Sequence, residues 1–292
     1  MQISNTLDTQ TIEIELTDEL RSLLKDQEKI REEMKFNVTE LPYLEFVSYV
    51  NGQQLPEPST CITLLLFEQL FEQYPELARI KEKIVISTFR TSFTSDSGLN
   101  GETNMHMDNM LFPGDKDRNL LVTWGLGTEA STIKNSIFIE ALRNKILDLY
   151  YTDGLDLFDN FSDFNKSFFD HPDKSIDELF AIDTYDESFK KIVKGLVETY
   201  PLDEPRILKS VAPNKNDNIT ALIISGKEVY HRRETIVGQA PSYRYALNIY
   251  FDSKEILVMG GRKNGGRKNG RKSKKSATKK NKKKTNRKRS SY

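Results

Sequence analysis

Strand-like runs that lie far apart in the chain set the strongest constraint on its fold. Two come early, at 84–89 and 119–126, and two come late, at 220–227 and 243–251. They are rich in branched and aromatic residues, which favour strands. The long segment from about 127 to 215 has a largely helical pattern instead. We therefore expect strands from both ends of the chain to build one core, with residues 127–215 as an insert.

The triplet His106-Met107-Asp108 lies between the two early runs, and His231 follows the first late run. In an extended segment residues i and i+2 face the same side, so His106 and Asp108 can present an imidazole and a carboxylate together. A second imidazole from another strand completes a two-histidine, one-carboxylate set, which is typical of non-haem Fe(II) sites with open positions. We predict His106, Asp108 and His231 as iron ligands. The remaining histidine, His171, lies in a polar turn of the insert and is the alternative to His231.

Together these residues resemble the 2-oxoglutarate- and Fe(II)-dependent dioxygenases, with a prolyl-hydroxylase-like pattern, over roughly residues 84–126 and 220–252. The resemblance implies an α+β protein with a double-stranded β-helix (jelly-roll) core. It also implies Fe(II) and 2-oxoglutarate as cofactors, with ascorbate as the reductant, and no catalytic residue beyond the metal ligands. In that family a basic residue one strand after the distal histidine binds the far carboxylate of 2-oxoglutarate, and Arg244 occupies that place.

The chemistry of the co-substrate suits an arginine at this position. A guanidinium is always charged and matches a carboxylate with two parallel hydrogen bonds, which a lysine cannot do. Some members of the family add a serine two residues after the arginine, but here that position is Ala246. The second donor to the carboxylate is then expected to be Tyr250, Asn248 or a residue on another strand.

Helical patterns flank and interrupt the strand-like runs. One runs from Leu16 to about Met34, and another, capped by Ser59-Thr60, runs to Phe71 and continues after Pro75. We expect these helices to brace one face of the core. Within the insert, the spacing predicts a helix over 135–151 and, further on, two helical pieces over 175–200. An acidic, aromatic stretch over 153–173 lies between the first helix and these two pieces. The role of the insert stays open between a substrate lid, a dimer contact, a partner surface and a small separate core.

The formal net charge of +0 conceals a strong asymmetry. Residues 260–292 hold 16 of the 43 basic residues and no acidic ones, which leaves 27 basic against 43 acidic residues in 1–259. A segment so rich in Lys and Arg and so poor in apolar residues is predicted to be disordered. Association with nucleic acid through 262–289 is one expectation for it, because clustered cations bind phosphates. A nuclear address and a solubilising tail are the alternatives.

Composition bears on the cellular location of the protein and on its class of substrate. No apolar run approaches the roughly 20 residues that span a bilayer, and the first residues lack the pattern of a secretion signal. Cys61 is the single cysteine, so no intrachain disulfide forms, and an intracellular site, cytoplasmic or nuclear, is expected. The acidic body favours hydroxylation of a protein or peptide side chain. Demethylation or hydroxylation of nucleic acid is the alternative reaction, and a non-catalytic jelly roll tethered by its tail is the alternative class. The oligomeric state is not predicted.

Overall fold

The computed structural model describes residues 9–53, 61–92, 105–107, 113–234 and 243–260, without the side chains of 257–260. The predicted ligand Asp108, the predicted capping pair Ser59-Thr60 and the basic segment 261–292 lie outside the described residues. Among the residues that are described, no helix is long and apolar enough to cross a membrane.

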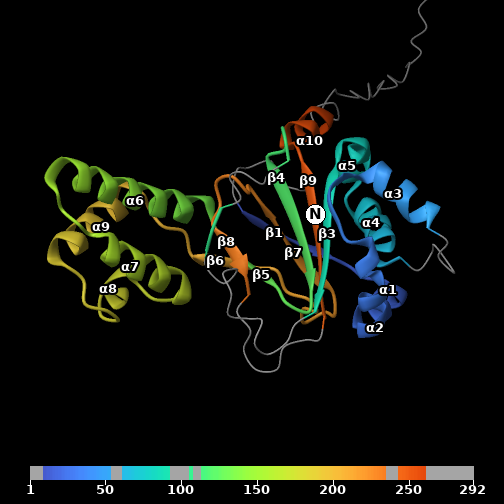
Figure 1. The fold of residues 1–292 in the computed structure, drawn as a ribbon, viewed down its shortest axis with the longest axis horizontal. Helices are drawn as coiled ribbons and strands as arrows, with labels where there is room; N and C mark the ends of the chain where they lie inside the picture. The colour runs from blue at the N-terminus through green and yellow to red at the C-terminus, as the bar shows by residue number, and fades with distance from the viewer. Residues whose placement is uncertain (1–8, 54–60, 93–104, 108–112, 235–242, 261–292) are drawn as a thin grey trace, which may run out of the picture.

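Two antiparallel sheets form the centre of the molecule (Figure 1). The larger has the strand order β1-β7-β4-β9-β3-β2 and the smaller the order β6-β5-β8. The strands of the larger sheet are β1 (Gln10–Ile14), β2 (Val38–Pro42), β3 (Val85–Ser92), β4 (Arg118–Trp124), β7 (Ile219–Ile224) and β9 (Tyr243–Phe251). Those of the smaller sheet are β5 (Thr128–Ser131), β6 (Ile207–Lys209) and β8 (His231–Arg233).

Early and late parts of the chain pair directly in the larger sheet, as the sequence predicts. β9 lies between β3 and β4, with Ala246 opposite both Phe89 and Thr123. The combination of helices with two antiparallel sheets confirms the predicted α+β class. The jelly-roll winding of the strands stays a prediction.

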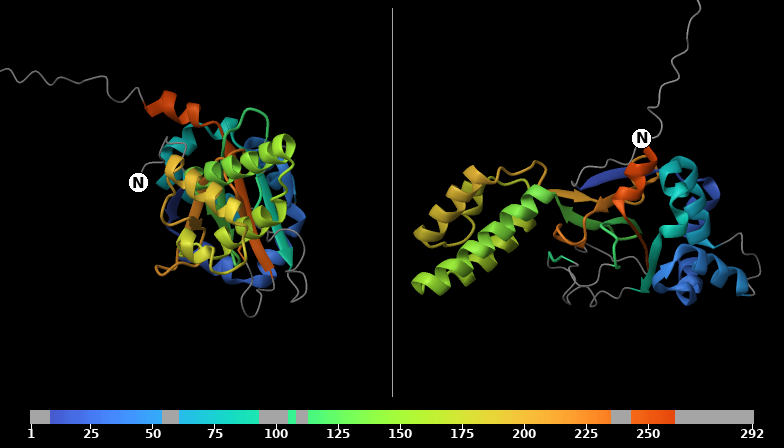
Figure 2. Two further views of the ribbon diagram at one scale, coloured as in Figure 1. Left: turned by 90° about the vertical axis from the view of Figure 1, so that its left-hand side faces the viewer. Right: turned by 90° about the horizontal axis from the view of Figure 1, so that it is seen from above.

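The N-terminal helices cover one face of the larger sheet (Figures 1 and 2). The main apolar core lies between them, with Leu66, Phe67 and Leu70 on the helical side and Leu120, Val122 and Leu247 on the sheet. The elements on this side are α1 (Asp18–Lys25), α2 (Gln27–Glu32), η1 (Glu33–Phe36), α3 (Tyr43–Gly52), α4 (Ile62–Gln73), α5 (Pro75–Arg79) and η3 (Lys81–Lys83). The helix α10 (Ser253–Gly260) follows β9.

The helix expected from Leu16 to Met34 is divided at Asp26. The Asp26 side chain accepts hydrogen bonds from the backbone N–H groups of Glu28 and Lys29, and therefore caps a new helix. A side chain that satisfies the first N–H groups of a helix favours a restart at that point, which periodicity alone does not show. Pro75 also marks the start of a new helix, α5, but by a different means. A proline is favourable at the first position of a helix, because the backbone N–H that it lacks would have no partner there.

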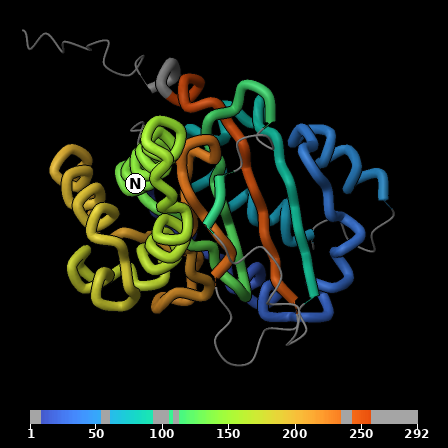
Figure 3. The backbone as a smooth tube through the Cα atoms, turned by 60° about the vertical axis from the view of Figure 1, so that its left-hand side comes forward, coloured from blue at the N-terminus to red at the C-terminus, as the bar shows by residue number. Residues whose placement is uncertain are grey.

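The helices of the insert form a separate unit beside the smaller sheet (Figures 1 and 3). They are α6 (Ile133–Asp153), α7 (Phe158–Asp170), α8 (Ile176–Leu179) and α9 (Glu187–Thr199). Phe138, Phe164, Phe168 and Phe189 are fully buried in their shared core. The helical part therefore covers 133–199, while β5 and β6, which lie within the expected insert of 127–215, belong to the smaller sheet.

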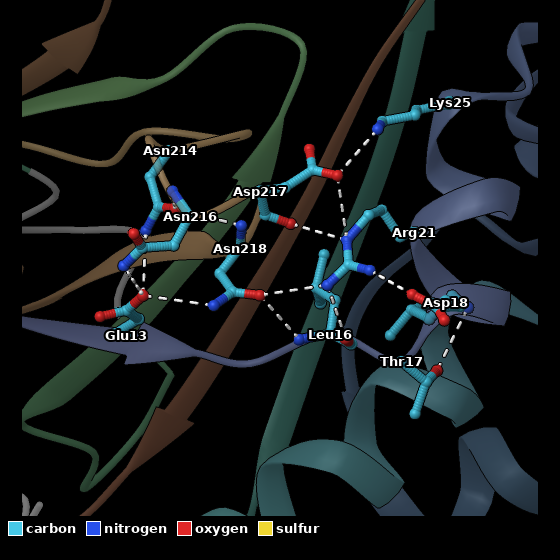
Figure 4. Close-up of polar contacts among 11 residues, drawn as sticks. Glu13, Leu16, Thr17, Asp18, Arg21, Lys25, Asn214, Asn216, Asp217 and Asn218 are labelled. Atoms are coloured by element: carbon cyan, nitrogen blue, oxygen red, sulfur yellow. Dashed lines mark hydrogen bonds and ion pairs between the residues drawn. The ribbon is translucent and has the colours of Figure 1, made fainter.

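A polar cluster fixes the loop before β7 against β1 and α1 (Figure 4). The Glu13 carboxylate accepts hydrogen bonds from the side-chain amides of Asn216, Asn218 and Asn214, at 3.1, 3.3 and 3.4 Å. On the other side of the loop, Arg21 donates to the carbonyl of Asp217 at 2.9 Å. Glu13 and Arg21 thus hold the loop of residues 214–218 from two sides. β7, which begins directly after this loop, pairs in register with β1.

Candidate functional site

A cavity of about 570 Å³ lies between the two sheets. Small-molecule sites have volumes of roughly 300–1,000 Å³, so this cavity has the size of a ligand site. Its lining brings together predicted site residues from distant parts of the chain. The described residues that line it are Phe89, Thr91, Ser92, His106, Leu121, Thr123, Thr128, His231, Arg232, Arg233, Arg244, Ala246 and Asn248.

His106 and His231 are paired directly. Each backbone N–H donates to the carbonyl of the other residue, at 2.9 and 2.8 Å, in an isolated antiparallel bridge. Residues paired in this way carry their side chains on the same side of the strands. The ring centroids accordingly lie 4.7 Å apart. Two histidines separated by 125 positions in the sequence are therefore neighbours, as a shared metal requires.

The ring of His231 is buried and oriented. Its Nδ1 lies 3.3 Å from the carbonyl oxygen of Val229. The tautomer with a proton on Nδ1 donates this hydrogen bond and directs Nε2 toward a metal, an arrangement typical of metal-ligating histidines. His106 is exposed, and its ring approaches from the neighbouring segment.

The third predicted ligand, Asp108, lies outside the described residues. Within the described part of the chain, no group of three or more His, Cys, Asp or Glu side chains is placed to hold a metal ion. The described residues thus supply two imidazoles, and Asp108 stays a prediction. The alternative histidine, His171, is exposed at the end of α7 and does not line the cavity.

Alternate residues of β9 face the cavity side of the larger sheet. Arg244, Ala246 and Asn248 line the cavity, whereas Tyr250, the next residue on that face, does not. The guanidinium of Arg244 is oriented by two hydrogen bonds, from Nε to the carbonyl of Leu126 and from Nη2 to the hydroxyl of Thr128, each 3.1 Å long. Of the three residues predicted to bind the co-substrate, the structure brings Arg244 and Asn248 to the cavity and leaves Tyr250 outside its lining.

Hydroxyl groups at the cavity were not predicted as site residues. Thr123 lies directly opposite Ala246 on β4, and Thr91 lies opposite Arg244 on β3. The register of these strands was the missing information, because it decides which hydroxyls stand beside the arginine. Ala246 takes the place of the serine that some family members have, and the hydroxyl groups of the cavity lining belong to Thr91, Ser92, Thr123 and Thr128, of which Thr128 accepts a hydrogen bond from Arg244.

Two glycines allow the chain to pass from the larger sheet to the smaller one at this site. Gly125 has φ of 87°, a left-handed conformation that other residues adopt only with strain. A Cβ at Gly127 would stand 2.3 Å from the carbonyl oxygen of Ser210. The Gly125-Leu126-Gly127 turn therefore places the Leu126 carbonyl and Thr128 where Arg244 contacts them.

The helical unit contacts the chain at Tyr230, just before β8, and at Arg232 within β8, although Arg232 also lines the cavity. The Tyr230 hydroxyl donates to Glu140 of α6, and the Tyr230 backbone N–H donates to Ser136. Burial, and then the bond to Glu140, raise the pKa of this hydroxyl, so it stays protonated and acts as the donor. Tyr230 and Arg232 contact the helices, and His231 and Arg233 alternate with them along β8.

Arg232 provides a second connection from β8 to the helical unit. Its Nε lies 2.7 Å from Glu129 of β5, and its Nη1 lies 2.6 Å from Asp170 of α7. Burial lowers the pKa of Arg232, but the bonds to Asp170 and Glu129 raise it by more. Burial likewise raises the pKa of Asp170, and the bonds from Lys166 and Arg232 outweigh that effect and lower it.

We expect Asp170→Asn to lower the free energy of unfolding by about 1–2 kcal/mol at neutral pH, because a charge-assisted hydrogen bond is lost. The folded-state pKa of Asp170 lies below its unfolded value, so its contribution is present above the unfolded value and is lost as the pH falls through the folded one. Urea unfolding at a series of pH values should therefore show the two proteins converging in acid. Glu198→Gln, at an exposed position of α9, is the control. Equal stabilities at neutral pH would contradict the expectation.

Comparisons with known proteins give a distant likeness. No family model matches the chain, and no curated protein matches it. Among solved structures, the Kdo hydroxylase KdoO, described as a non-heme Fe(II) alphaketoglutarate dependent dioxygenase, matches in complexes with succinate and with alphaketoglutarate. Each match has 10% identity and a TM-score of 0.34, and covers 87% of this chain and 86% of that one. Its apo structure matches with a TM-score of 0.33.

Proposed function

We propose that this protein is an Fe(II)- and 2-oxoglutarate-dependent oxygenase that hydroxylates a protein or peptide side chain. One observation carries the proposal: His106 and His231 are paired across a hydrogen-bonded bridge, in the same cavity as Arg244. Their convergence from three segments of the chain on one ligand-sized cavity is the arrangement that this chemistry requires.

The residues present fit ferrous iron. Neutral imidazoles and a carboxylate suit Fe(II), and three ligands on one face leave positions for other groups. His106, His231 and Asp108 would hold the metal. Iron and 2-oxoglutarate, when bound, would supply the oxidation that couples decarboxylation to succinate with hydroxylation of the substrate, and ascorbate would keep the iron ferrous.

The chain itself supplies orientation and exclusion of water. Arg244, held by Leu126 and Thr128, presents its guanidinium to the distal carboxylate of 2-oxoglutarate. Asn248 lies on the same face of β9, where its amide can support that carboxylate. Phe89, Leu121 and Ala246 make the adjoining wall apolar. Polar groups that are held in place before binding position a co-substrate at a lower entropic cost.

Replacement of Arg244 tests the proposal. In wild type we expect Fe(II)-dependent formation of succinate from 2-oxoglutarate, with ascorbate and oxygen present. Arg244→Met should weaken 2-oxoglutarate binding roughly 10- to 100-fold, because a bidentate charge-assisted contact is lost, and Arg244→Lys should recover only part of the affinity. Metal binding should persist in both variants. Arg143→Met, at an exposed position of α6, is the matched control. Absence of metal-dependent 2-oxoglutarate binding in wild type would contradict the proposal.

Other roles expected from the sequence have no support among the described residues. Nucleic-acid association through 262–289 concerns a segment outside them. Nucleic-acid demethylation and a non-catalytic, tethered jelly roll stay alternatives to the proposal. The turnover assay separates the last of these from an enzyme, because a protein without catalysis forms no succinate.

A further inference from the structure

Three exposed aromatic rings gather at the end of the helical unit that is remote from the sheets. α6 runs away from the sheets, and its last turn and the start of α7 lie at that end (Figures 1 and 2). Tyr150, Tyr151 and Phe158 are 43%, 79% and 37% exposed there. The ring centroid of Tyr150 lies 5.5 Å from that of Tyr151 and 5.2 Å from that of Phe158. Exposed rings gathered in one place are typical of an interaction surface, and we call these three residues the aromatic patch.

The surroundings of the aromatic patch are acidic. From residue 148 to residue 163 the chain holds five aspartates and no lysine or arginine. Asp148 pairs with Lys145 of the preceding helical turn, at 3.3 Å. Asp153 and Asp159 are exposed, and neither forms an ion pair within residues 113–234, which the structure describes without a gap. The rings are therefore bordered by carboxylates that can attract a cation.

The carboxyl end of α6 adds to this negative potential. α6 has 21 residues and holds no basic residue in its last turn, where Tyr150, Tyr151 and Asp153 lie. The dipole of a helix places partial negative charge at its carboxyl end, which favours a nearby cation. The face of an aromatic ring attracts a lysine or arginine side chain as well. Rings, carboxylates and helix end thus all favour the same kind of group, a Lys or Arg side chain.

We propose that the aromatic patch is the docking site for the basic segment of this same chain, residues 261–292. The segment holds 16 Lys and Arg and no Asp or Glu, so its charge is complementary to that around the patch. It follows α10 directly. Its 32 residues can span up to about 110 Å, whereas α6 is only about 32 Å long, so the segment can reach the patch.

The shared chain favours this occupant over a separate basic protein. Two groups in one molecule meet at an effective concentration that a separate partner has to exceed in solution. Docking also has a consequence for the segment itself. Lys and Arg side chains that contact the aromatic patch are withdrawn from phosphates, so docking opposes the binding of nucleic acid through 262–289. The inference is independent of the proposed oxygenase activity.

Carbodiimide cross-linking of the full-length protein tests this docking. The reagent joins a carboxylate to a lysine amine that contacts it, and mass spectrometry identifies the two linked residues. We expect links within one molecule from lysines of 263–288 to the aspartates that border the aromatic patch, Asp153, Asp156 and Asp159. Their yield should fall as the salt concentration rises, because salt screens the attraction.

Replacement of two rings separates a specific site from general attraction of charge. At the salt concentration that halves the yield of these links in wild type, Tyr150→Ser combined with Tyr151→Ser should lower the yield at least about threefold. Two ring faces are then lost while every carboxylate remains. Tyr151→Ser alone, at the most exposed of the three positions, should lower it about twofold and serves if the double variant fails to fold. Ile137→Ser is the matched control, because Ile137 is 46% exposed near the other end of α6.

Three results would overturn the inference. The links could be absent, or no more frequent than links to the exposed carboxylates of Asp173 and Glu198, which would leave only a general attraction. The yield could be equal in wild type and in the folded tyrosine variants, which would exclude a role for the rings. In a mixture of isotope-labelled and unlabelled protein, the links could join the two forms, which would make a second copy of the chain the occupant.

Discussion

His231→Ala is expected to abolish 2-oxoglutarate turnover and to reduce affinity for Fe(II) by at least about 100-fold. The ring of His231 is buried, oriented by the Val229 carbonyl and 4.7 Å from the ring of His106, so its loss removes a prearranged ligand. Loss of a ligand costs more than loss of an outer contact, which typically weakens metal binding 10- to 100-fold. His106→Ala should have the same effect. Anaerobic titration with Fe(II) and the succinate assay measure the two quantities.

His171→Ala is the matched control, because it removes an imidazole that is exposed at the end of α7, away from the cavity. It should leave both metal affinity and turnover at the wild-type level. Circular dichroism should show that the His231 variant stays folded, since the backbone hydrogen bonds of the His106–His231 bridge do not involve the side chains. A His231 variant that still binds iron and turns over 2-oxoglutarate would refute the assignment of this pair as metal ligands.

The approach of His106 and His231 could be anticipated from the His106-x-Asp108 motif and the family resemblance, not from a strand pattern, because the two residues meet in an isolated bridge. The place of Arg244 could be anticipated from its strand, because Tyr243–Phe251 is recognisable by its aromatic and branched residues. Arg233 could not be anticipated in the same way. It lies in β8, a strand of 3 residues, His-Arg-Arg, whose polar sequence has no strand signature. The pairing of Arg233 with Thr128 joins residues 105 positions apart, and no local pattern reports such a contact.

Tyr250 shows a different limit on predicting cavity residues from the sequence. Alternation along β9 correctly places it on the face of Arg244 and Asn248, but the cavity lining ends before it. How far a cavity extends along a strand depends on the packing of the opposite wall. Here Leu121, Leu222 and Ile224 pack with Ala130 and Val229, and this apolar cluster lies between the two sheets. The sequence identifies the face of a strand, whereas tertiary packing decides which part of it meets a ligand.

The predicted insert of 127–215 was longer than the helical part of 133–199 because two short strands at its ends were not recognised. β5 and β6 have 4 and 3 residues and lie directly beside long helices, so the helical pattern dominates the segment. The acidic, aromatic stretch forms α7, in which Phe164 and Phe168 are one helical turn apart and both buried. β1 and β2, at the edges of the larger sheet, were not predicted, because edge strands are short and need little apolar sequence.

A buried ion pair joins the N-terminal helices to the larger sheet. Glu33 of η1 is 2% exposed and Arg90 of β3 is 0% exposed, and Arg90 Nη2 lies 3.1 Å from Glu33 Oε2. Arg90 also donates to Thr63 and stacks over the ring of Tyr245, 4.8 Å from its centroid. The other carboxylate oxygen of Glu33 accepts from the backbone N–H of Ile62 at 2.7 Å, and so satisfies the start of α4. One carboxylate thus connects η1, α4 and β3.

Glu33→Ala is expected to lower the free energy of unfolding by about 3–5 kcal/mol, because it leaves the Arg90 charge buried without this partner. It also removes the acceptor for the first N–H of α4. Glu33→Gln should cost less, since an amide oxygen can still accept that bond. Glu32→Ala, at the exposed neighbouring position, should change stability by no more than about 0.5 kcal/mol. Urea unfolding of the metal-free proteins measures all three.

A double replacement separates the charge from the packing. If the cost of Glu33→Ala comes mainly from an unpaired buried cation, Arg90→Met combined with Glu33→Leu should recover much of the lost stability, because apolar residues of similar volume often replace a buried pair without loss. If the double variant is as unstable as Glu33→Ala, the loss of stability comes instead from lost packing and from the lost cap of α4. Because β3 also carries Phe89 and Thr91 to the cavity, the recovered protein should bind 2-oxoglutarate as wild type does. Weakened binding in the stable double variant would show that the ion pair also sets the position of β3 at the site.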